Sequence, residues 1–528
     1  MAYLRENWLE IPMLFGLVVI SLFSSRFFPT LIPEKVIGTA LGVYLIIQVV
    51  DKLCRFTVRI AATGRNPMRI LVISFIVLIL GGAGFLMLPT FHNNGHLSVV
   101  DACFTTTSAA CVTGLIVKDT GSDFTIYGQF VILILIQLGG LGIVIFGAVI
   151  AQLFGKAFSL SESVAMQDLL SADTVSRIGR MIGFVFMFTI IAETLGAAGL
   201  YSMWDTVSGI DLTAGQKIYY SVFHSISAFC NAGFALFGDS FMKYAYSGEI
   251  YWVVCPLIVI GGLGFSVLYN ISNLIVDKFR ILLYKFTHPA DLMLPQQPKR
   301  LRLQSKITLL ATGCLIIGGT IGFMVLMKNH PGNAGLRYEN GFRRFMDAAF
   351  MSVTSRTAGF NTVDISQLSG ASKLWTIVLM CIGGSPGSTA GGIKTVTLVV
   401  LVMAVWTTVL GRGEVEIFKR SIRYVIIGRA LTVMVFYIIA LLVAIFALCV
   451  TERQSDFTMM DIAFEAASAM GTVGLSTGIT AALSSAGKVV IIAAMLTGRL
   501  GPLTLLASFM FNTKTSKYSY PDEAVVVG

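Results

Sequence analysis

Four short segments of the 528-residue chain share residue types at the same spacing, and these types can hold a cation without a charged ligand. Each has a phenylalanine, a serine or threonine four residues later, and a glycine nine or ten residues after the phenylalanine. They read FTTTSAACVTGL from Phe104, FHSISAFCNAGF from Phe223, FMSVTSRTAGF from Phe350 and FEAASAMGTVGL from Phe464. Glycine tolerates positive φ, so neighbouring carbonyl groups can point the same way. A ring of four such loops can replace the hydration shell of a cation.

The repeated unit extends to both sides of each segment. Three copies carry an aspartate three residues before the phenylalanine, which suits the positive end of a short helix and can cap it: Asp101, Asp347 and Asp461. A glycine pair follows each segment, in LGGLG at 138–142, IGGLG at 260–264, IGGSPG at 382–387 and TGRLG at 497–501, where arginine replaces the second glycine. The sequence therefore predicts four units of helix, short helix, glycine loop and helix.

Composition places these units in a membrane. Hydrophobic residues make up 55% of the chain and charged residues only 12%, against about 25% charged residues in soluble domains. This excludes a soluble enzyme, a disulfide-linked scaffold and a nucleic-acid-binding protein. Because a spanning helix needs about 20 apolar residues, we expect an all-α polytopic membrane protein with about ten transmembrane helices. We attribute the net charge of +10 to the positive-inside rule.

Apolar runs predict the spanning helices, and four shorter apolar segments predict re-entrant helices. The predicted spans cover residues 8–28, 35–54, 68–89, 124–153, 176–203, 247–276, 305–327, 371–410, 425–450 and 484–511, with 371–410 interrupted in its middle. The short segments lie near 99–111, 217–230, 343–355 and 458–470.

Lysine and arginine predict the orientation in the membrane. Three connections are strongly basic, at residues 52–69, 277–306 and 411–424. The positive-inside rule places them in the cytoplasm, and ten spans then place both termini there too. The connection 328–346 is also basic although this topology places it outside, and we have no account of it.

With these motifs the chain resembles the Trk/Ktr/HKT superfamily of potassium transporters. The resemblance covers residues 68 to 528 and is most specific in the four glycine segments, in GGSPGSTAGGIKT at 383–395 and in GRLGPLT at 498–504. The ending YPDEAVVVG at 520–528 resembles the Ktr-type subunit, and the two extra N-terminal helices resemble the Trk-type subunit, so both branches stay open. The resemblance implies a single-chain, pseudo-tetrameric pore. We expect extra helices in 1–66 and pore repeats in 67–160, 161–300, 301–415 and 416–528.

The resemblance also implies the residues of a potassium filter and of a gate. The filter residues are Val112, Thr113, Gly114, Asn231, Ala232, Gly233, Thr357, Ala358, Gly359, Thr472, Val473 and Gly474. This filter is shorter and less regular than TVGYG, which favours one well-formed K⁺ site and weaker discrimination against Na⁺. The gate residues are Gly383, Gly384, Ser385, Pro386, Gly387, Ser388, Thr389, Ala390, Gly391, Gly392, Lys394 and Arg499. The glycines and Pro386 prevent an uninterrupted helix, which predicts an intramembrane loop that blocks the pore below the filter.

Arg499 is the charged residue that departs from the repeat. An arginine inside a spanning segment is costly and usually faces a cavity or a partner, so we expect Arg499 to lie opposite the loop of the third repeat. Glu193 and Glu465 are intramembrane acids. Glu465, in the fourth short helix, is expected either to balance a nearby base or to bond to a helix end.

Other functions fit the sequence less well. The potassium-binding subunit of a Kdp-type ATP-driven pump would carry Asn-Gly-Gly filter segments, and a channel-like transporter with low Na⁺/K⁺ selectivity is a further alternative. A membrane-embedded enzyme would need clustered acids or histidines, but the five histidines are scattered and the eight cysteines form no C-x-x-C. We therefore predict no enzymatic activity, no catalytic residue, no bound transition metal and no cofactor other than the K⁺ ion.

The resemblance implies the cellular setting as well. It predicts a multi-pass protein of the bacterial cytoplasmic (inner) membrane that forms a homodimer within the lipid bilayer. A cytoplasmic ring of nucleotide-binding regulatory subunits would gate it, and the basic connection 277–306 could dock that ring. No nucleic-acid partner is expected.

Overall fold

The computed structural model describes residues 67–93, 97–142, 178–205, 212–287, 300–327 and 341–509. The predicted extra helices in 1–66 and the C-terminal sequence 520–528 lie outside the described residues. Within them the chain is almost entirely helical, with one small β-hairpin, β1 (Val415–Ile417) and β2 (Arg420–Ile422), in the predicted 411–424 connection.

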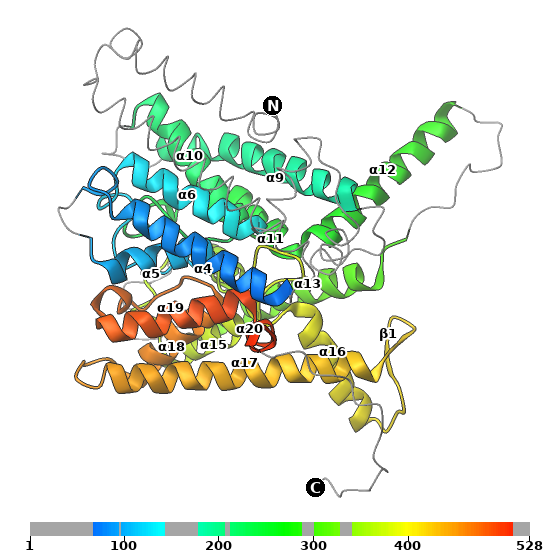
Figure 1. The fold of residues 1–528 in the computed structure, drawn as a ribbon. Helices are drawn as coiled ribbons and strands as arrows, with labels where there is room; N and C mark the ends of the chain where they lie inside the picture. The colour runs from blue at the N-terminus through cyan, green and yellow to red at the C-terminus, as the bar shows by residue number, and fades with distance from the viewer. Residues whose placement is uncertain are drawn as a thin grey trace, which may run out of the picture.

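The helices follow the order of the predicted repeats (Figure 1). The first repeat contains α4 (Pro67–Leu86), α5 (Val99–Ala110) and α6 (Ile126–Leu141). The second contains α9 (Ile178–Leu200), α10 (Ala214–Phe229), the π-helical turn η4 (Ile250–Val254), α11 (Cys255–Leu263) and α12 (Phe265–Thr287). The third contains α13 (Leu303–Leu326), α14 (Gly341–Thr354), α15 (Gly370–Cys381) and α16 (Thr395–Val409). The fourth contains α17 (Tyr424–Thr451), α18 (Met459–Gly471), α19 (Ser485–Leu500) and α20 (Pro502–Phe509). Short 3₁₀ turns are η2 (Met203–Asp205), η3 (Met242–Tyr244) and η6 (Thr480–Ala482).

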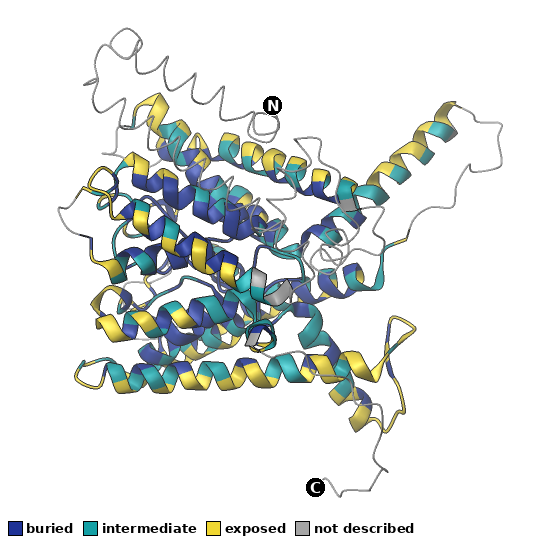
Figure 2. Cartoon of the chain, viewed as in Figure 1, coloured by how far each residue is buried: buried dark blue, intermediate teal, exposed yellow. Residues whose placement is uncertain are grey.

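The four short helices α5, α10, α14 and α18 lie where the sequence predicted them, and their repeated phenylalanines anchor them. Phe104, Phe223, Phe350 and Phe464 are each fully buried. Burying a phenylalanine stabilises a fold by about 1.5–3 kcal/mol, so each anchor fixes the depth of its helix. Figure 2 shows the buried residues gathered in the middle of the molecule, with exposed residues along the outer sides of α12 and α17.

Asp101 and Asp461 are not the N-cap residues of α5 and α18, which corrects the predicted position of the cap. The side chains of Ser98 and Thr458 accept hydrogen bonds from the backbone N–H groups of Asp101 and Asp461. The cap therefore lies three residues before each aspartate, because a short hydroxyl side chain in extended backbone fits that position. Asp101 and Asp461 lie in the first helical turn, and the hydroxyl of Thr458 also donates to the Asp461 carboxylate at 2.6 Å.

The long apolar runs are bent rather than straight, which corrects the predicted continuous spans 247–276 and 484–511. Gly264 and Gly501 have φ of 88° and 83°, and at these glycines the chain turns by 102° between α11 and α12 and by 94° between α19 and α20. Three described helices are long and apolar enough to cross a membrane, or up to five if each bent pair counts as one span. The predicted interruption of 371–410 is confirmed, since α15 ends at Cys381 and α16 begins at Thr395.

The repeats pack in a closed cyclic order. The helix α6 of the first repeat packs against α10 of the second, α11 against α14, α15 against α18, and α19 of the fourth repeat returns to α5 of the first. The helix α17 lies beside α18 and α19, and α12 extends away from the other helices (Figure 1). This order brings the four loops that follow the short helices to one place.

Candidate functional site: a ring of four glycine loops

Each short helix ends in a loop with the same unusual backbone. The residue two before each glycine has a positive φ, of 55° at Val112, 58° at Asn231, 74° at Thr357 and 50° at Thr472. The glycines themselves have φ of 90° at Gly114, 69° at Gly233, 82° at Gly359 and 92° at Gly474. Positive φ is strained for residues with a Cβ, so its repetition in four loops marks a common conformation that the surroundings enforce.

The four glycines close a ring. A Cβ on Gly114 would lie 2.5 Å from the carbonyl oxygen of Ala232, and one on Gly233 would lie 2.8 Å from that of Ala358. A Cβ on Gly359 would overlap the carbonyl oxygen of Val473, and one on Gly474 would overlap that of Thr113. Each glycine thus lies against the carbonyl that precedes the glycine of the next loop, so the ring has no room for side chains and is lined by backbone.

Repeated hydroxyl groups hold these loops to their helices. The Oγ atoms of Ser108 and Ser468 accept hydrogen bonds from the N–H groups of Gly114 and Gly474, both at 3.1 Å. In the other two repeats the hydroxyl donates instead, from Ser227 to the carbonyl of Phe234 at 2.8 Å and from Thr354 to that of Phe360 at 2.6 Å. The serine or threonine found four residues after each phenylalanine therefore fixes the loop geometry in all four repeats.

A second set of polar contacts ties neighbouring repeats together. Each uses the residue ten positions before the first glycine of a glycine pair, and these residues are not among the predicted site residues. Lys488 contacts Asp101 at 2.8 Å and Lys373 contacts Asp461 at 3.0 Å. The hydroxyl of Tyr251 donates to Asp347 at 2.9 Å, and that of Tyr219 to the side-chain oxygen of Gln129 at 3.0 Å. These four links follow the cyclic order of the helices, and a search for equal offsets in the repeats would have revealed them.

The pKa of Asp101, which lies in the non-spanning helix α5, is set by burial and by a neighbouring positive charge. Burial raises the pKa of its carboxyl group, but hydrogen bonds from Lys488 and Ser98 and the positive charge of Lys488 outweigh burial and hold the pKa below its usual value of 3.8. The same balance, with Thr458 and Lys373, lowers the pKa of Asp461. Both links are therefore ion pairs at neutral pH.

A cavity of about 420 Å³ opens on one side of the ring. All four glycines line it, together with residues that follow them in the chain, such as Ala235, Asn361 and Ser476. Asp239 and Asp364 add two carboxylates to the lining, and no lysine or arginine is among the described residues that line it. The two carboxylates make this cavity attractive to cations, and we call it the glycine-ring cavity.

The other side of the ring faces the loop between α15 and α16, residues 382–394. Its ends lie side by side, since Gly383 N–H donates to the carbonyl of Ile393 at 2.9 Å. Ser385 N–H donates to the carbonyl of Gly262 at 3.0 Å, and a Cβ on Gly391 would overlap the side chain of Thr472, a predicted filter residue. The predicted gate residue Gly391 thus lies against the predicted filter residue Thr472, and the loop contributes no residue to the described lining of the glycine-ring cavity.

Three cationic side chains contact the backbone of the 382–394 loop. Arg499 donates from Nη1 to the carbonyl of Thr389 and from Nη2 to that of Gly139. Lys394 Nζ donates to the carbonyl of Ala390 at 2.6 Å, and Arg356 Nη2 to that of Gly383 at 3.5 Å. Arg499 and Lys394 are among the predicted gate residues, whereas Arg356 is not. It follows α14, which already carries Arg343, Arg344 and Asp347, so a further charge there gave no distinctive signal.

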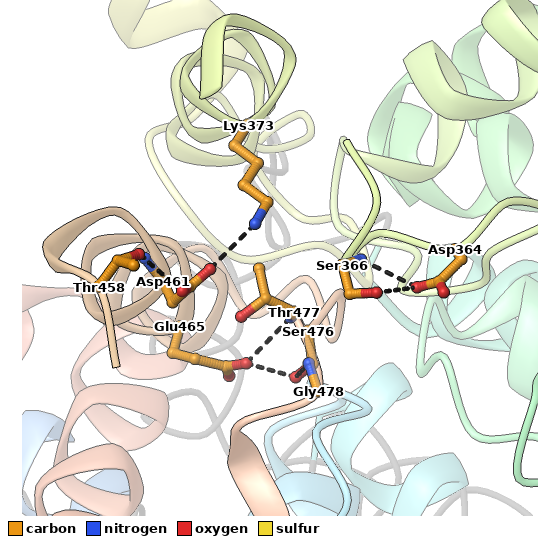
Figure 3. Close-up of polar contacts among 9 residues, drawn as sticks. All are labelled: Asp364, Ser366, Lys373, Thr458, Asp461, Glu465, Ser476, Thr477 and Gly478. Atoms are coloured by element: carbon orange, nitrogen blue, oxygen red, sulfur yellow. Dashed lines mark hydrogen bonds and ion pairs between the residues drawn. The ribbon is translucent and has the colours of Figure 1, made fainter. Parts of the chain in front are cut away.

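The two intramembrane acids bond to neutral groups. Glu193 accepts a hydrogen bond from Gln137 at 3.0 Å. Glu465 accepts hydrogen bonds from the hydroxyl of Ser476 and from Thr477 N–H at 3.2 Å, as Figure 3 shows. Of the two partners expected for Glu465, a base or a helix end, neither donates these hydrogen bonds. The donors belong to the loop after the fourth glycine, because this loop folds back over its own helix.

The family model of TrkH, a cation transport protein, matches residues 38–519. The chain belongs to this family. The TrkH-family chain is 36% identical over 467 residues to Ktr system potassium uptake protein B of Vibrio alginolyticus, covering 88% of this chain and 96% of that protein. It is 37% identical over 463 residues to Ktr system potassium uptake protein B of Bacillus subtilis, covering 88% and 97%.

Two further similarities bear on function and fold. Potassium/sodium uptake protein NtpJ of Enterococcus hirae is 35% identical to this TrkH-family chain over 469 residues, covering 88% of this chain and 97% of that protein. The crystal structure of the potassium transporter TrkH from Vibrio parahaemolyticus matches with a TM-score of 0.65 at 17% identity, covering 95% of this chain and 96% of that one. The fold of the chain is therefore TrkH-like.

Proposed function

We propose that this chain carries potassium into the cell across the cytoplasmic membrane, through a pore whose selective constriction is the ring of Gly114, Gly233, Gly359 and Gly474. The observation that carries the proposal is the closed contact of each glycine with the backbone of the next loop. A backbone-lined ring offers carbonyl oxygens in place of a hydration shell. The relatives named as potassium uptake proteins support the choice of ion.

Threonine side chains add to the proposed filter. Among the described residues, the buried hydroxyl groups of Thr113, Thr357 and Thr472 have no hydrogen-bond partner in the protein. A buried hydroxyl without a partner costs free energy, and a dehydrated cation nearby would satisfy its oxygen. We propose that these hydroxyls complete the ion site as ligands or as neighbours of it.

The 382–394 loop is proposed to close the pore. It lies against the filter residue Thr472, and Arg499 bonds to its backbone. Positive charge in a low-dielectric path raises the barrier for a cation. Opening then requires the loop and the guanidinium to move apart, and we propose, from the family resemblance, that a cytoplasmic ring of nucleotide-binding subunits drives this step on a homodimer.

The sequence similarities favour the Ktr branch, because two of the relatives are Ktr system proteins. One observation supports a second candidate, a transporter that carries Na⁺ as well as K⁺: the relative named as a potassium/sodium uptake protein is 35% identical. A Kdp-type pump subunit is not favoured by the family match or by these relatives.

The test is ion uptake by the purified chain in proteoliposomes. An inward concentration gradient of K⁺ or of Na⁺ is imposed in parallel, with protein-free liposomes as the control and with ATP present or absent. We expect K⁺ uptake that exceeds Na⁺ uptake and needs no ATP hydrolysis by this chain. Equal K⁺ and Na⁺ uptake supports the second candidate, and no uptake above protein-free liposomes contradicts both.

A further inference from the structure

Two of the short helices place a buried polar side chain behind the loop that follows their glycine. Glu465 and His224 occupy the same repeat position, directly after the repeated phenylalanine, and both are fully buried. Glu465 Oε1 accepts a hydrogen bond from Thr477 N–H at 3.2 Å, and His224 Nε2 accepts one from Leu236 N–H at 3.3 Å. Thr477 and Leu236 each lie three residues after the glycine of their loop. The same backbone amide is thus held from the same helix position in two repeats.

We call this hydrogen bond from the helix side chain to the loop amide the tether. The side chains at this position in the first and third repeats do not make it. Thr105, at the same position in the first repeat, donates its hydroxyl to the carbonyl of Asp101 in its own helix at 2.9 Å. Met351, at that position in the third repeat, has no strong hydrogen-bonding group. Because the repeats follow one another around the ring, the second and fourth loops lie on opposite sides of it. The two tethers therefore face each other across the proposed pore.

The chemistry of each tether fixes its orientation. Since a backbone amide is a donor, His224 Nε2 must carry a lone pair, and its proton lies on Nδ1, which donates to the carbonyl of Tyr220 at 2.7 Å. The imidazole is stacked on Phe237 at 5.8 Å between ring centroids. Glu465 accepts from Thr477 N–H and from the hydroxyls of Ser476 and Thr480, the last at 3.0 Å. Figure 3 shows this carboxylate directed at the fourth loop.

The held amides are close to the ring. Leu236 lies between Ala235 and Phe237, which line the glycine-ring cavity, and Thr477 lines it directly with Ser476. Only two residues separate each amide from its glycine, so a shift of the amide is transmitted to the glycine carbonyl. A carbonyl cage discriminates between cations by its size and by the strength and number of its dipoles. Such a shift therefore changes the preference for K⁺ over Na⁺.

We propose that His224 and Glu465 are a pair of positioning residues that set K⁺ over Na⁺ preference by holding the second and fourth loops from behind. This inference rests on the proposed function. The preference for K⁺ over Na⁺ then depends mainly on the second and fourth loops, which lie opposite each other, rather than equally on all four loops. Neither residue contacts the ion; each acts through the backbone of its loop.

The experiment compares variants that remove the acceptor with variants that keep it. His224→Phe keeps an aromatic ring among its aromatic neighbours but loses the acceptor, whereas His224→Gln keeps an acceptor near the Nε2 position. Glu465→Met removes the acceptor, whereas Glu465→Gln keeps an oxygen for Thr477 N–H. Thr105→Val is the matched control, because it removes a buried hydroxyl at the same repeat position that holds no loop. K⁺ and Na⁺ uptake are measured in proteoliposomes at equal protein.

We expect His224→Phe and Glu465→Met to lower the ratio of K⁺ to Na⁺ uptake by roughly tenfold, in keeping with the loss of one buried hydrogen bond. The glutamine variants retain most of the ratio, and Thr105→Val matches the wild type. An unchanged ratio in both His224→Phe and Glu465→Met overturns the inference, and so does an equal fall in Thr105→Val.

A second measurement covers variants that give too little protein for flux. The concentrations of K⁺ and of Na⁺ that half-maximally raise the Tm are compared in detergent, and loss of the K⁺ preference is expected in the acceptor-free variants. A retained K⁺ preference overturns the inference. A wild type that takes up no K⁺ overturns the proposed function together with it, whereas a K⁺-selective wild type with equally selective variants overturns the tether pair alone.

Discussion

A Cβ on Gly474 would lie 3.0 Å from the Cα of Gly114, so the last glycine loop of the chain meets the first. This contact closes the ring that the other loops form in sequence order. Ion pairing supports the same closure, because Lys488 of the fourth repeat contacts Asp101 of the first at 2.8 Å. The site is therefore built from both ends of the described chain, and it needs every repeat in place.

The ion pair between Lys488 and Asp101 makes a prediction about stability and pH. Lys488→Met should lower the stability at pH 7 by about 1.5–3 kcal/mol, the usual contribution of a hydrogen bond to a charged group. Because the fold lowers the pKa of Asp101 below 3.8, the unfolded chain binds the proton first, and the contribution is present above that value and is lost as pH falls through the lower folded pKa.

The measurement is the Tm of both proteins in detergent between pH 7 and pH 3. The Tm difference between wild type and Lys488→Met should shrink as the pH falls below about 4. Lys243→Met is the control, since Lys243 pairs with Asp239 at 3.2 Å but is 59% exposed, and exposed pairs contribute little. A difference that stays constant down to pH 3 would show that packing rather than charge connects the two repeats.

Removal of Ser385 to Gly391 tests the proposed gate. The ends of the 382–394 loop are adjacent, with Gly383 N 2.9 Å from the carbonyl oxygen of Ile393, so the shortened chain can close without moving α15 or α16. We predict a several-fold rise in K⁺ flux in proteoliposomes and less dependence on a cytoplasmic partner, because the obstacle beneath the ring is gone. A flux that falls in proportion to the amount of folded protein would assign the loop a structural role only.

Arg499 is predicted to hold the closed state. Arg499→Ala removes a charge and the hydrogen bonds to the carbonyls of Thr389 and Gly139, so basal K⁺ leak should rise while the ratio of K⁺ to Na⁺ uptake stays the same. Arg499→Lys should be intermediate, because lysine keeps the charge but not the planar set of donors. The measurement is basal K⁺ efflux from loaded proteoliposomes.

The control for this prediction is Arg429→Ala, which removes an exposed arginine from α17 and should leave the leak unchanged. Suppose that Arg499→Ala leaks no more K⁺ than the wild type at equal protein, with and without a regulatory partner. Arg499 is then a packing residue, and its charge does not contribute to closing the pore.

The sequence predicted those structural features that arise from a local pattern present in every repeat. The spacing from phenylalanine to glycine located the four short helices, because each phenylalanine is an anchor and each glycine a backbone requirement that no other residue meets. The interruption of 371–410 was also predictable, since glycines and Pro386 cannot continue a helix.

Features set by tertiary contacts were not predictable in the same way. The bends at Gly264 and Gly501 lie inside apolar runs that look continuous, because hydropathy reports burial in lipid and not direction. From the sequence, the partner of Glu465 could be either a base or a helix end. The donors are Ser476 and Thr477, which reach Glu465 only because their loop folds over α18. Arg356 gave no repeat signal, since its contact with Gly383 depends on where the loop packs.

The central claim is that the four glycines form the potassium-selective constriction. Each has a positive φ, and a Cβ at any of them would meet the backbone of the next loop, as at Ala232 O for Gly114 and at Ala358 O for Gly233. Serine at such a position strains the backbone and displaces a carbonyl of the ring. Gly313→Ser is the matched control, because a Cβ on Gly313 of α13 meets no atom within 4 Å.

The direct test is the ratio of K⁺ to Na⁺ uptake in proteoliposomes for the wild type, Gly313→Ser and the four serine variants at Gly114, Gly233, Gly359 and Gly474. We predict that the ratio falls in each of the four ring variants that folds and stays at the wild-type value in Gly313→Ser. A well-folded ring variant whose ratio equals that of the wild type would contradict the assignment of this ring as the filter.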